Sequence, residues 1–411
     1  MVMGREELGQ RSETVRRANL SAIVRELHLH GPLSRSELVA RTGLTRSAIR
    51  ALIGELVTGE LVVEEPALRL GTPGRPSPLV RLATESTVVL ALEISIDSLA
   101  VAILGAGGVV LEHRRVDRPR GHSTLEEIAA DLVDLARAAR ARRPLGETPI
   151  GVGVAVAGIV NRSDGLVSFA PNLGWVDVPL GATLTAGLAL PVPVGVANES
   201  DLGALAELRR GAARGADDVL YVHGEVGVGG GIIVDGRPLS GIAGYGGEIG
   251  HMPINPQGRP CRCGSTGCWE TEVGERALLA RAGYPLDGGR AAVDAVLADA
   301  AAGVPEALAA LQSVGRWLGL GLAGLVNILN PRRVILGGLL SRIHPFVADL
   351  VEASLDRHAL AAPRRLVSVV PSTLGVDAPL LGAAEMAFEP LLADPAAWLG
   401  TRGALVQLES A

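Results

Sequence analysis

One short stretch, residues 248–270, holds every cysteine of this 411-residue chain and limits how that part of the chain can fold. Cys261, Cys263 and Cys268 fall within eight positions, and His251 lies ten residues before the first of them. One imidazole and three thiolates complete the four-coordinate shell that Zn²⁺ adopts in structural sites. A disulfide is the weaker alternative, because Cys-x-Cys is a strained pairing and three cysteines leave one over. The stretch therefore predicts a structural zinc site with the ligands His251, Cys261, Cys263 and Cys268.

Composition places the chain among globular proteins of two or three domains. Apolar residues make up 48% and charged residues 20% of its 411 residues, which is enough to build cores. No apolar run reaches the roughly 18 residues of a membrane span, and the polar N-terminus lacks a signal peptide. We therefore expect a cytoplasmic protein with no membrane partner.

Charge is distributed unevenly along the chain. Residues 1–82 carry 12 Arg and 9 Glu, whereas the remainder is acidic enough to bring the whole chain to a net charge of −6. A basic segment attached to an acidic body is a weak indication of nucleic-acid binding.

The N-terminal segment has the pattern of three short helices. Apolar residues recur at helical spacing from residue 14 to residue 30, where Gly31-Pro32 ends the first helix. Ser34 or Ser36 can cap a second helix, and Thr45 can cap a third after a break at Thr42-Gly43. Three helices with a short glycine turn between the second and third predict a helix-turn-helix unit.

The third helix is the one expected to contact DNA. Its apolar face leaves Arg46, Ser47 and Arg50 outward near its N-terminus, where recognition helices meet bases and phosphates; a solvated arginine face is the alternative. Residues 61–64 and 78–82 predict two strands of a wing, whose tip carries an arginine suited to a narrow minor groove. The predicted winged helix-turn-helix spans residues 14–83, with DNA contacts at Ser34, Thr45, Arg46, Ser47, Arg50 and Arg75.

Beyond residue 83 the pattern predicts two α/β lobes with a cleft between them, which describes an actin-like fold. Strands come first and then alternate with helices, first in residues 84–198 and again in residues 199–390. The apolar helix at 305–329 is either a dimer element or buried within its own lobe. The predicted division is a mobile tail (1–13), the DNA-binding domain (14–83), lobe I (84–198), lobe II (199–390) with its zinc loop (248–270), and a C-terminal segment (391–411) packing back on lobe I.

The motif around the cysteines resembles a known family signature. Gly247-Glu248-Ile249-Gly250-His251, Gly258, Cys261-Arg262-Cys263-Gly264 and Gly267-Cys268-Trp269-Glu270 are similar to the signature of the ROK family of sugar repressors and sugar kinases. With the N-terminal head, the chain from residue 14 resembles a ROK transcriptional regulator of the xylose-repressor kind. The resemblance implies a ribonuclease H-like, actin-like sugar-binding domain.

Three stretches argue against the kinase branch of that family. The first phosphate loop of the kinases, Asp-x-Gly-Gly-Thr, corresponds here to Glu93-Ile94-Ser95-Ile96-Asp97, which has no glycine and an added carboxylate. The second, Gly-Thr-Gly-x-Gly, corresponds to Glu225-Val226-Gly227-Val228-Gly229. The catalytic Asp corresponds to Glu199, whose longer side chain would displace a sugar hydroxyl from in-line geometry. We therefore expect no kinase activity and no bound ATP.

The resemblance also implies which residues bind sugar. Family members bind the sugar with residues that match Asn198, Glu199, Glu248, His251 and Glu270. Carboxylates and amides suit vicinal hydroxyl groups chemically. Asn172 is a further candidate, and Trp175 either stacks on the sugar or packs in the core. For Glu248 and Glu270 the alternative role is support of the metal ligands.

The sequence as a whole predicts a repressor of carbohydrate-utilisation genes. Operator DNA and a monosaccharide or sugar derivative are the expected partners, and the protein is expected to form a homodimer or tetramer. An ATP-dependent sugar kinase and a zinc-responsive regulator are the alternatives.

Overall fold

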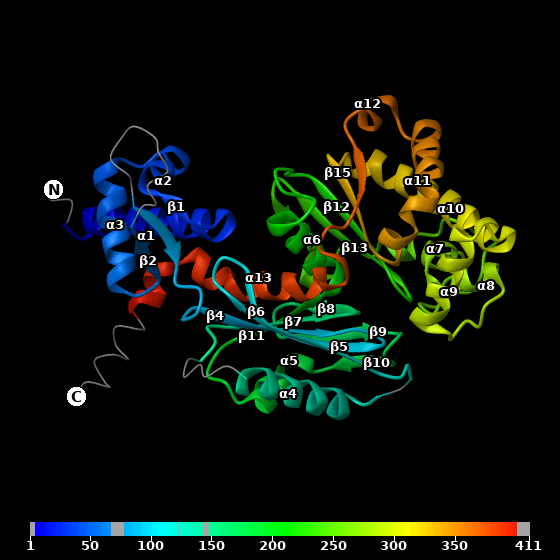
Figure 1. The fold of residues 1–411 in the computed structure, drawn as a ribbon, viewed down its shortest axis with the longest axis horizontal. Helices are drawn as coiled ribbons and strands as arrows, with labels where there is room; N and C mark the ends of the chain where they lie inside the picture. The colour runs from blue at the N-terminus through cyan, green and yellow to red at the C-terminus, as the bar shows by residue number, and fades with distance from the viewer. Residues whose placement is uncertain (1–4, 67–77, 122, 143–147, 401–411) are drawn as a thin grey trace.

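The computed structural model describes residues 5–66, 78–121, 123–142 and 148–400, and the account below concerns these residues. They form an N-terminal head followed by two α/β lobes (Figure 1). No helix in these ranges is long and apolar enough to cross a membrane.

The head consists of three helices and a small antiparallel sheet of strand order β1-β3-β2. Ser34 caps α2 by accepting a hydrogen bond from the Glu37 backbone N–H, and Thr45 caps α3 in the same way through Ala48. Of the two predicted caps for the second helix, Ser34 is therefore the one used. The elements are α1 (Arg5–His30), β1 (Leu33–Ser34), α2 (Arg35–Thr42), α3 (Arg46–Thr58), β2 (Val62–Glu65) and β3 (Leu79–Leu82).

Helix α1 begins at Arg5, so the predicted mobile tail of residues 1–13 is wrong for residues 5–13. This stretch lacks apolar periodicity, but it is rich in Glu and Arg, which are good helix formers. An ion pair between Glu13 and Arg16, three residues apart, joins it to the rest of the helix. The segment 1–4 lies outside the described residues, as does the predicted wing tip with Arg75.

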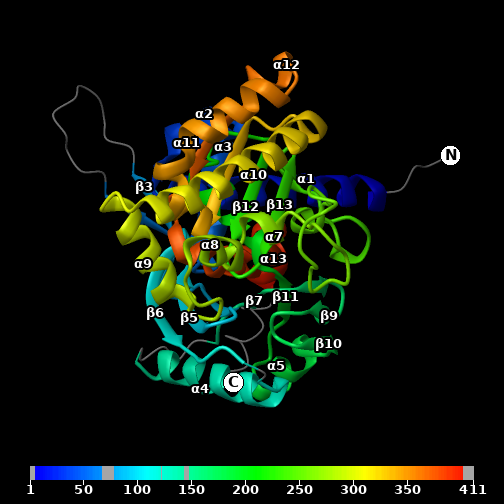
Figure 2. The same cartoon turned by 90° about the vertical axis from the view of Figure 1, so that its right-hand side faces the viewer.

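The first lobe is built on a five-stranded sheet of order β11-β7-β4-β5-β6. Helices α4 and α5 cover its outer face (Figure 2). The order expected for residues 84–198, strands first and then strands alternating with helices, is present, but the small sheet β10-β9-β8 was not predicted. Its strands are only three to five residues long, too short for a clear alternation. The lobe comprises β4 (Val88–Ile94), β5 (Ser98–Gly105), β6 (Val109–Asp117), α4 (Leu125–Ala141), β7 (Val152–Val156), β8 (Ile159–Asn161), β9 (Leu166–Ala170), β10 (Trp175–Val178), α5 (Leu180–Leu188) and β11 (Val194–Asn198).

The second lobe repeats the plan with a sheet of order β14-β13-β12-β15-β16. Helix α10 has twelve buried residues packed inside this lobe, which favours the second of the two roles considered for it. The elements are α6 (Glu199–Arg210), β12 (Val219–Gly224), β13 (Val228–Val234), β14 (Arg237–Pro238), η1 (Ile242–Gly244), η2 (Ile249–His251), α7 (Glu270–Val273), α8 (Glu275–Ala282), α9 (Gly289–Ala301), α10 (Pro305–Leu329), β15 (Arg333–Gly338), α11 (Leu339–His358), α12 (Ala361–Arg364), β16 (Ser368–Pro371) and η3 (Gly375–Asp377).

Helix α13 (Ala378–Ala393) returns the chain to the first lobe, so the predicted end of lobe II at residue 390 is too late. It lies against β4, β7 and α6 and also contacts α1 of the head (Figure 1). Its approach to β7 is close, because a Cβ on Gly153 would lie 1.9 Å from the carbonyl oxygen of Ala383. Sequence periodicity can show that such a helix is apolar. It cannot show which lobe the helix packs against.

A buried ionic cluster joins α1, α6 and α13. Glu385 on α13 is 1% exposed and accepts hydrogen bonds from Arg209 (3.1 Å) and Arg210 (2.7 Å) at the end of α6. His28 of the head lies 3.0 Å away. Because the Gly107 N–H donates to Nδ1 of His28, the proton on Nε2 is free to donate to Glu385.

This cluster keeps Glu385 ionised. Burial by itself would raise the pKa of its carboxyl group, but the hydrogen bond from His28 and the charges of Arg210 and Arg209 outweigh burial. The pKa is therefore held well below its ordinary value of 4.5. The head and the second lobe are thus both tied to a single carboxylate of the first lobe's inner helix.

We predict that Glu385→Gln destabilises the protein by about 3–5 kcal/mol at neutral pH, because two guanidinium groups lose their buried partner. Since the folded-state pKa is lowered, this stabilisation is present above pH 4.5 and is lost as pH falls toward the folded-state pKa. Urea unfolding at pH 7 and pH 3 measures both effects. Glu352→Gln, which breaks an exposed pair with Arg364, is the control and should change stability by less than about 1 kcal/mol. Equal unfolding midpoints for the two variants would contradict the role assigned to Glu385.

Candidate functional site

The four predicted metal ligands come together in the loop between η2 and α7. The ligand atoms of His251, Cys261, Cys263 and Cys268 all lie within 4.8 Å of one another. The Sγ atoms of Cys263 and Cys268 are 3.6 Å apart, and Cys261 Sγ is 3.7 Å from His251 Nδ1. Zinc–sulfur bonds near 2.3 Å in a tetrahedral shell place sulfur atoms about 3.8 Å apart. The donor set and spacing fit one four-coordinate metal ion.

The same distances exclude the disulfide alternative. A disulfide requires a sulfur–sulfur distance of about 2.05 Å, and all three cysteines are free. The loop reaches this shape through glycines at positive φ, Gly264 at 91° and Gly267 at 74°. A Cβ on Gly267 would lie 1.6 Å from the Asn255 carbonyl oxygen, so the turn requires glycine.

Two carboxylates lie directly beside this centre. Glu248 Oε2 is 3.8 Å from Nε2 of His251, the ring nitrogen opposite the one that faces Cys261. Glu270 Oε1 lies 2.9 Å from Cys261 Sγ. Both glutamates also line the cleft between the lobes, so the metal loop orients them toward that cleft.

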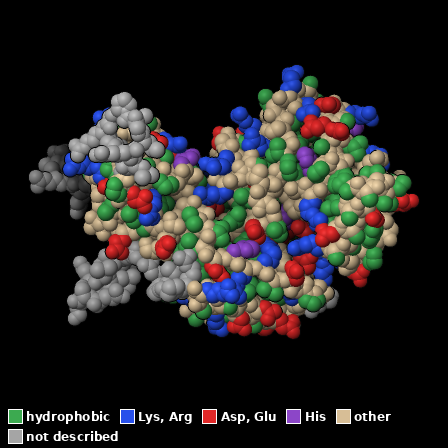
Figure 3. All heavy atoms as spheres, viewed as in Figure 1, with side chains coloured by type: hydrophobic (Ala, Val, Ile, Leu, Met, Phe, Trp, Pro, Cys, Tyr) green, Lys and Arg blue, Asp and Glu red, His purple; other side chains and the backbone are tan. Residues whose placement is uncertain are grey.

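All six residues predicted to bind sugar line one cleft of about 80 Å³ between the lobes. The wall also includes glycines of β13 and the loop that follows β9. In the space-filling view of Figure 3, charged side chains of both signs gather where the lobes meet. The six residues are Asn172, Asn198, Glu199, Glu248, His251 and Glu270.

The two asparagines of this set are already hydrogen-bonded to the protein. Asn198 caps α6 by accepting from the Ser200 N–H (2.7 Å) and donates to the Gly158 carbonyl (2.8 Å). Asn172 accepts from Arg262 of the metal loop (2.6 Å), which the sequence did not single out. Asn172 and Arg262 thus connect the first lobe to the metal loop across the cleft.

The structure decides the role of Trp175. Its side chain is 4% exposed, and its indole N–H donates to the Ser123 carbonyl (3.2 Å). It packs in the core of the first lobe and does not line the cleft, so the core-packing alternative is confirmed.

Two residues of the first turn of α6 were missed by sequence reasoning. Ser200 is 1% and Asp201 6% exposed, and neither Ser200 Oγ nor Asp201 Oδ2 has a hydrogen-bond partner among the described residues. Burial raises the pKa of Asp201 to about 7. The sequence could have indicated these two residues, because they directly follow the predicted sugar-binding residues Asn198 and Glu199.

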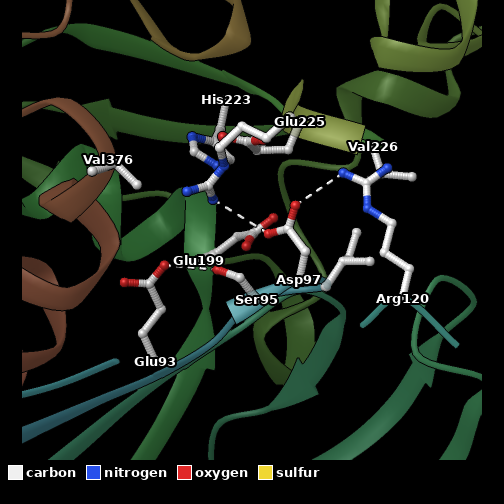
Figure 4. A pocket seen from close by; sticks show the side chains of 11 residues that line it. Glu93, Ser95, Asp97, Arg120, Glu199, His223, Glu225, Val226 and Val376 are labelled. Carbon is white, nitrogen blue, oxygen red and sulfur yellow. Dashed lines mark hydrogen bonds and ion pairs between the residues drawn. The ribbon is translucent and has the colours of Figure 1, made fainter. Parts of the chain in front are cut away.

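The two degenerate phosphate loops and Glu199 meet at a second, smaller cavity next to the cleft (Figure 4). Asp97 from the first loop and Glu225 from the second both line it, together with Glu93. Burial raises the pKa of Glu199 to about 8 and that of Glu225 to about 7. Carboxyl groups that already resist ionisation here would oppose an incoming phosphate.

The predicted DNA-contacting residues divide into two groups. Arg46, Ser47 and Arg50 are exposed near the start of α3, and the two arginines have no ion-pair partner among the described residues. Ser34 and Thr45 instead use their side chains as helix caps. Arg75 lies outside the described residues.

Comparison with known proteins agrees with this architecture. The profile of the ROK family matches residues 89–389. The xylose repressor of Bacillus spizizenii is 28% identical over 384 residues, covering 92% of this chain and 97% of the relative. The glucokinase of Streptomyces coelicolor is 32% identical over 320 residues, covering 74% of this chain and 98% of the relative.

A solved ROK transcriptional regulator, a homologue of the Escherichia coli Mlc protein, superposes with a TM-score of 0.76 at 25% identity. The superposition covers 94% of this chain and 98% of the regulator. The expected two-lobed, actin-like architecture is thereby confirmed. The xylose repressor and the solved transcriptional regulator match most of the chain, whereas the glucokinase covers a smaller share of it.

We predict that the purified protein holds one metal ion per chain and that Cys263→Ser lowers this content. Metal removal should lower stability by at least about 2 kcal/mol, or roughly 2–3 °C in melting temperature for a chain of this length, because binding to the folded state alone stabilises it. Elemental analysis and thermal unfolding with and without a chelator measure this. Ser265→Ala, in the same loop, is the control. A melting temperature that does not respond to the chelator would contradict a structural metal site.

Proposed function

The chain belongs to the ROK family, and on this premise we propose that it is a sugar-responsive transcriptional repressor of carbohydrate-utilisation genes. Its head binds operator DNA, and a monosaccharide or sugar derivative in the interlobe cleft releases it. One observation carries this proposal. Six side chains suited to binding sugar hydroxyl groups line one cleft, and the neighbouring small cavity, where the phosphate loops of a kinase would lie, is lined by carboxyl groups.

The head supports the DNA-binding half of the proposal. Three helices with a β1-β3-β2 sheet are the components of a winged helix-turn-helix. Arg35 is held by Glu64 and Arg41 by Glu26, whereas the exposed Arg46 and Arg50 remain available for phosphates or base edges. The strands of the wing are described, and the proposed minor-groove contact of Arg75 remains a prediction. A homodimer or tetramer would place two heads on a pseudo-palindromic operator.

The small cavity favours a repressor over a kinase. Phosphoryl transfer relies on backbone N–H groups and cations around the phosphates. Here Asp97, Glu199 and Glu225 line the corresponding region, and the two arginines that also line it, Arg120 and Arg290, are already paired with Asp97. A carboxylate is repelled by a phosphate at short range, and the first degenerate loop, Glu93–Asp97, has no glycine turn to compensate for this repulsion. We therefore propose that ATP is neither bound nor hydrolysed.

Helix α6 provides a physical route from sugar to DNA. Its first turn carries Glu199 and Ser200 in the cleft, and its last turn carries the arginines that hold Glu385 and, through it, His28 of the head. A ligand that favours one arrangement of the lobes would therefore also favour one position of the head. This route passes from α6 through Glu385 of α13 to the head.

We assign zinc a structural role in this scheme. Four protein ligands leave no open coordination position, and the metal loop positions Glu248 and Glu270 at the cleft. The alternative is a zinc-responsive regulator. It requires that the affinity for operator DNA change reversibly with the concentration of free zinc while the sugar concentration is held constant.

We predict that Arg50→Ala weakens binding to a DNA duplex selected by the protein from a random pool. The expected loss is about 1–3 kcal/mol if Arg50 contacts a base, and a smaller loss that is uniform across sequences if it contacts phosphate. Fluorescence anisotropy at several salt concentrations separates these cases. Arg137→Ala, an exposed change on α4, is the control. Unchanged affinity for Arg50→Ala would mean that α3 is not the recognition helix.

We also predict that at least one sugar in a panel including xylose and glucose raises the melting temperature and releases the selected DNA. Glu248→Gln should abolish both responses while leaving DNA binding without sugar intact. In a coupled assay with ATP and magnesium, the same sugars should give no turnover. Turnover that disappears on Glu199→Ala would establish the kinase alternative instead.

A further inference from the structure

The small cavity beside the sugar cleft is lined by several carboxyl groups, and the proposed function does not explain why they are there. Its volume is about 20 Å³, room for roughly one water-sized group. Four carboxyl groups line it, from β4, the segment after β4, the start of α6 and the turn between β12 and β13 (Figure 4). They belong to Glu93, Asp97, Glu199 and Glu225.

Two of these carboxyl groups are neutralised by arginines. Arg115 binds Glu93 at 2.8 Å. Arg120 and Arg290 both bind Asp97, at 3.0 and 3.3 Å. Arg120 also binds Glu275, so these guanidinium groups are already engaged.

The other two, Glu199 and Glu225, have no hydrogen bond and no ion pair with any described residue. The positive charge of Arg290 acts on Glu225 from a distance, but burial outweighs it. Both carboxyl groups line the cavity without a counter-ion, and burial favours their protonated forms, so a cation bound between them would supply the missing charge and favour their ionised forms.

A third group points to a ligand independently of these carboxyls. His223 is 5% exposed and lines the cavity. The Tyr221 hydroxyl lies 3.1 Å from its Nδ1 and, with no other acceptor for that hydroxyl proton, donates to it. The proton of His223 is therefore on Nε2, which has no acceptor among the described residues. Burial lowers the pKa of His223 to about 4, so it supplies an N–H donor and no positive charge at neutral pH.

Glu199, Glu225 and His223 together indicate which kind of ligand group would bind in the cavity. A divalent metal needs clustered ligand atoms, and the one such cluster within the described residues is that of His251 and the cysteines. A primary ammonium group has the size of a water molecule and donates to carboxylates in several directions. A hydroxyl oxygen next to the amine could accept from His223.

The cavity opens onto the sugar cleft, since Ile96 and Glu199 line both. We propose that the effector is an amino sugar, with its free ammonium group between Glu199 and Glu225 and a neighbouring hydroxyl oxygen accepting from His223. This proposal rests on the proposed function and narrows its ligand class. Neutral sugars would fill the cleft but leave the two carboxyl groups uncompensated.

The test measures binding of four amines to the full-length protein by calorimetry: glucosamine, galactosamine, mannosamine and 6-amino-6-deoxyglucose. Each is compared with its N-acetylated form and with its parent neutral sugar. At least one free amine should bind roughly tenfold or more tightly than both of its counterparts, because a charge-assisted hydrogen bond is gained. In Glu225→Gln this advantage should fall to about twofold or less, whereas the control Glu352→Gln should retain it.

Measuring both ligand binding and DNA release separates the amino-sugar proposal from the proposed repressor function. If neutral sugars bind and release the selected DNA and no amine is preferred, the amino-sugar proposal is overturned and the repressor function stands. If neither amines nor neutral sugars affect DNA binding, both fail. Equal stabilisation by potassium chloride and by the preferred amine would show a simple cation site and would also overturn the proposal. The comparison of amine with N-acetyl form uses the unaltered protein, so it does not depend on the folding of a variant.

Discussion

The buried carboxylate of Glu385 is the interaction on which the arrangement of the three parts depends. It lies on the helix that returns to the first lobe, and it is held by the last turn of α6 and by a histidine of the head. A buried ion is tolerated only when its partners are in place, so the head, α6 and α13 must assemble together. Because the first turn of α6 lies in the interlobe cleft, the same helix contacts both the proposed effector site and the base of the DNA-binding head.

Carboxyl groups line this cleft and the small cavity beside it. The metal loop holds Glu248 and Glu270 at one side of the cleft, and the degenerate phosphate loops bring Asp97 and Glu225 to the other. Carboxyl groups are therefore concentrated where an anionic donor would have to bind. Such a site favours hydroxyl groups and positive charge over a further anion.

Much of the fold could be predicted because its signals are local. The cap Thr45 was predicted correctly, Ser34 was one of two predicted candidates, and the order of strands and helices in both lobes followed from short-range patterns. The errors were of a different kind. Residues 5–13 form helix without an apolar stripe, the strands of the small β8–β10 sheet are too short to alternate, and α13 was assigned to the wrong lobe because its burying partners are far away in sequence.

The sequence by itself determined the grouping of His251 with the three cysteines, because these four residues lie within eighteen positions and glycine turns bring them together. Together with the degenerate loops, it also determined which carboxylates replace phosphate-binding groups. Only the tertiary structure decided that His28, Arg209 and Arg210 converge on Glu385, and that Glu199, Glu225 and His223 share one cavity. These groups come from segments separated by many residues, and their proximity follows from sheet order and helix packing, which local patterns do not encode.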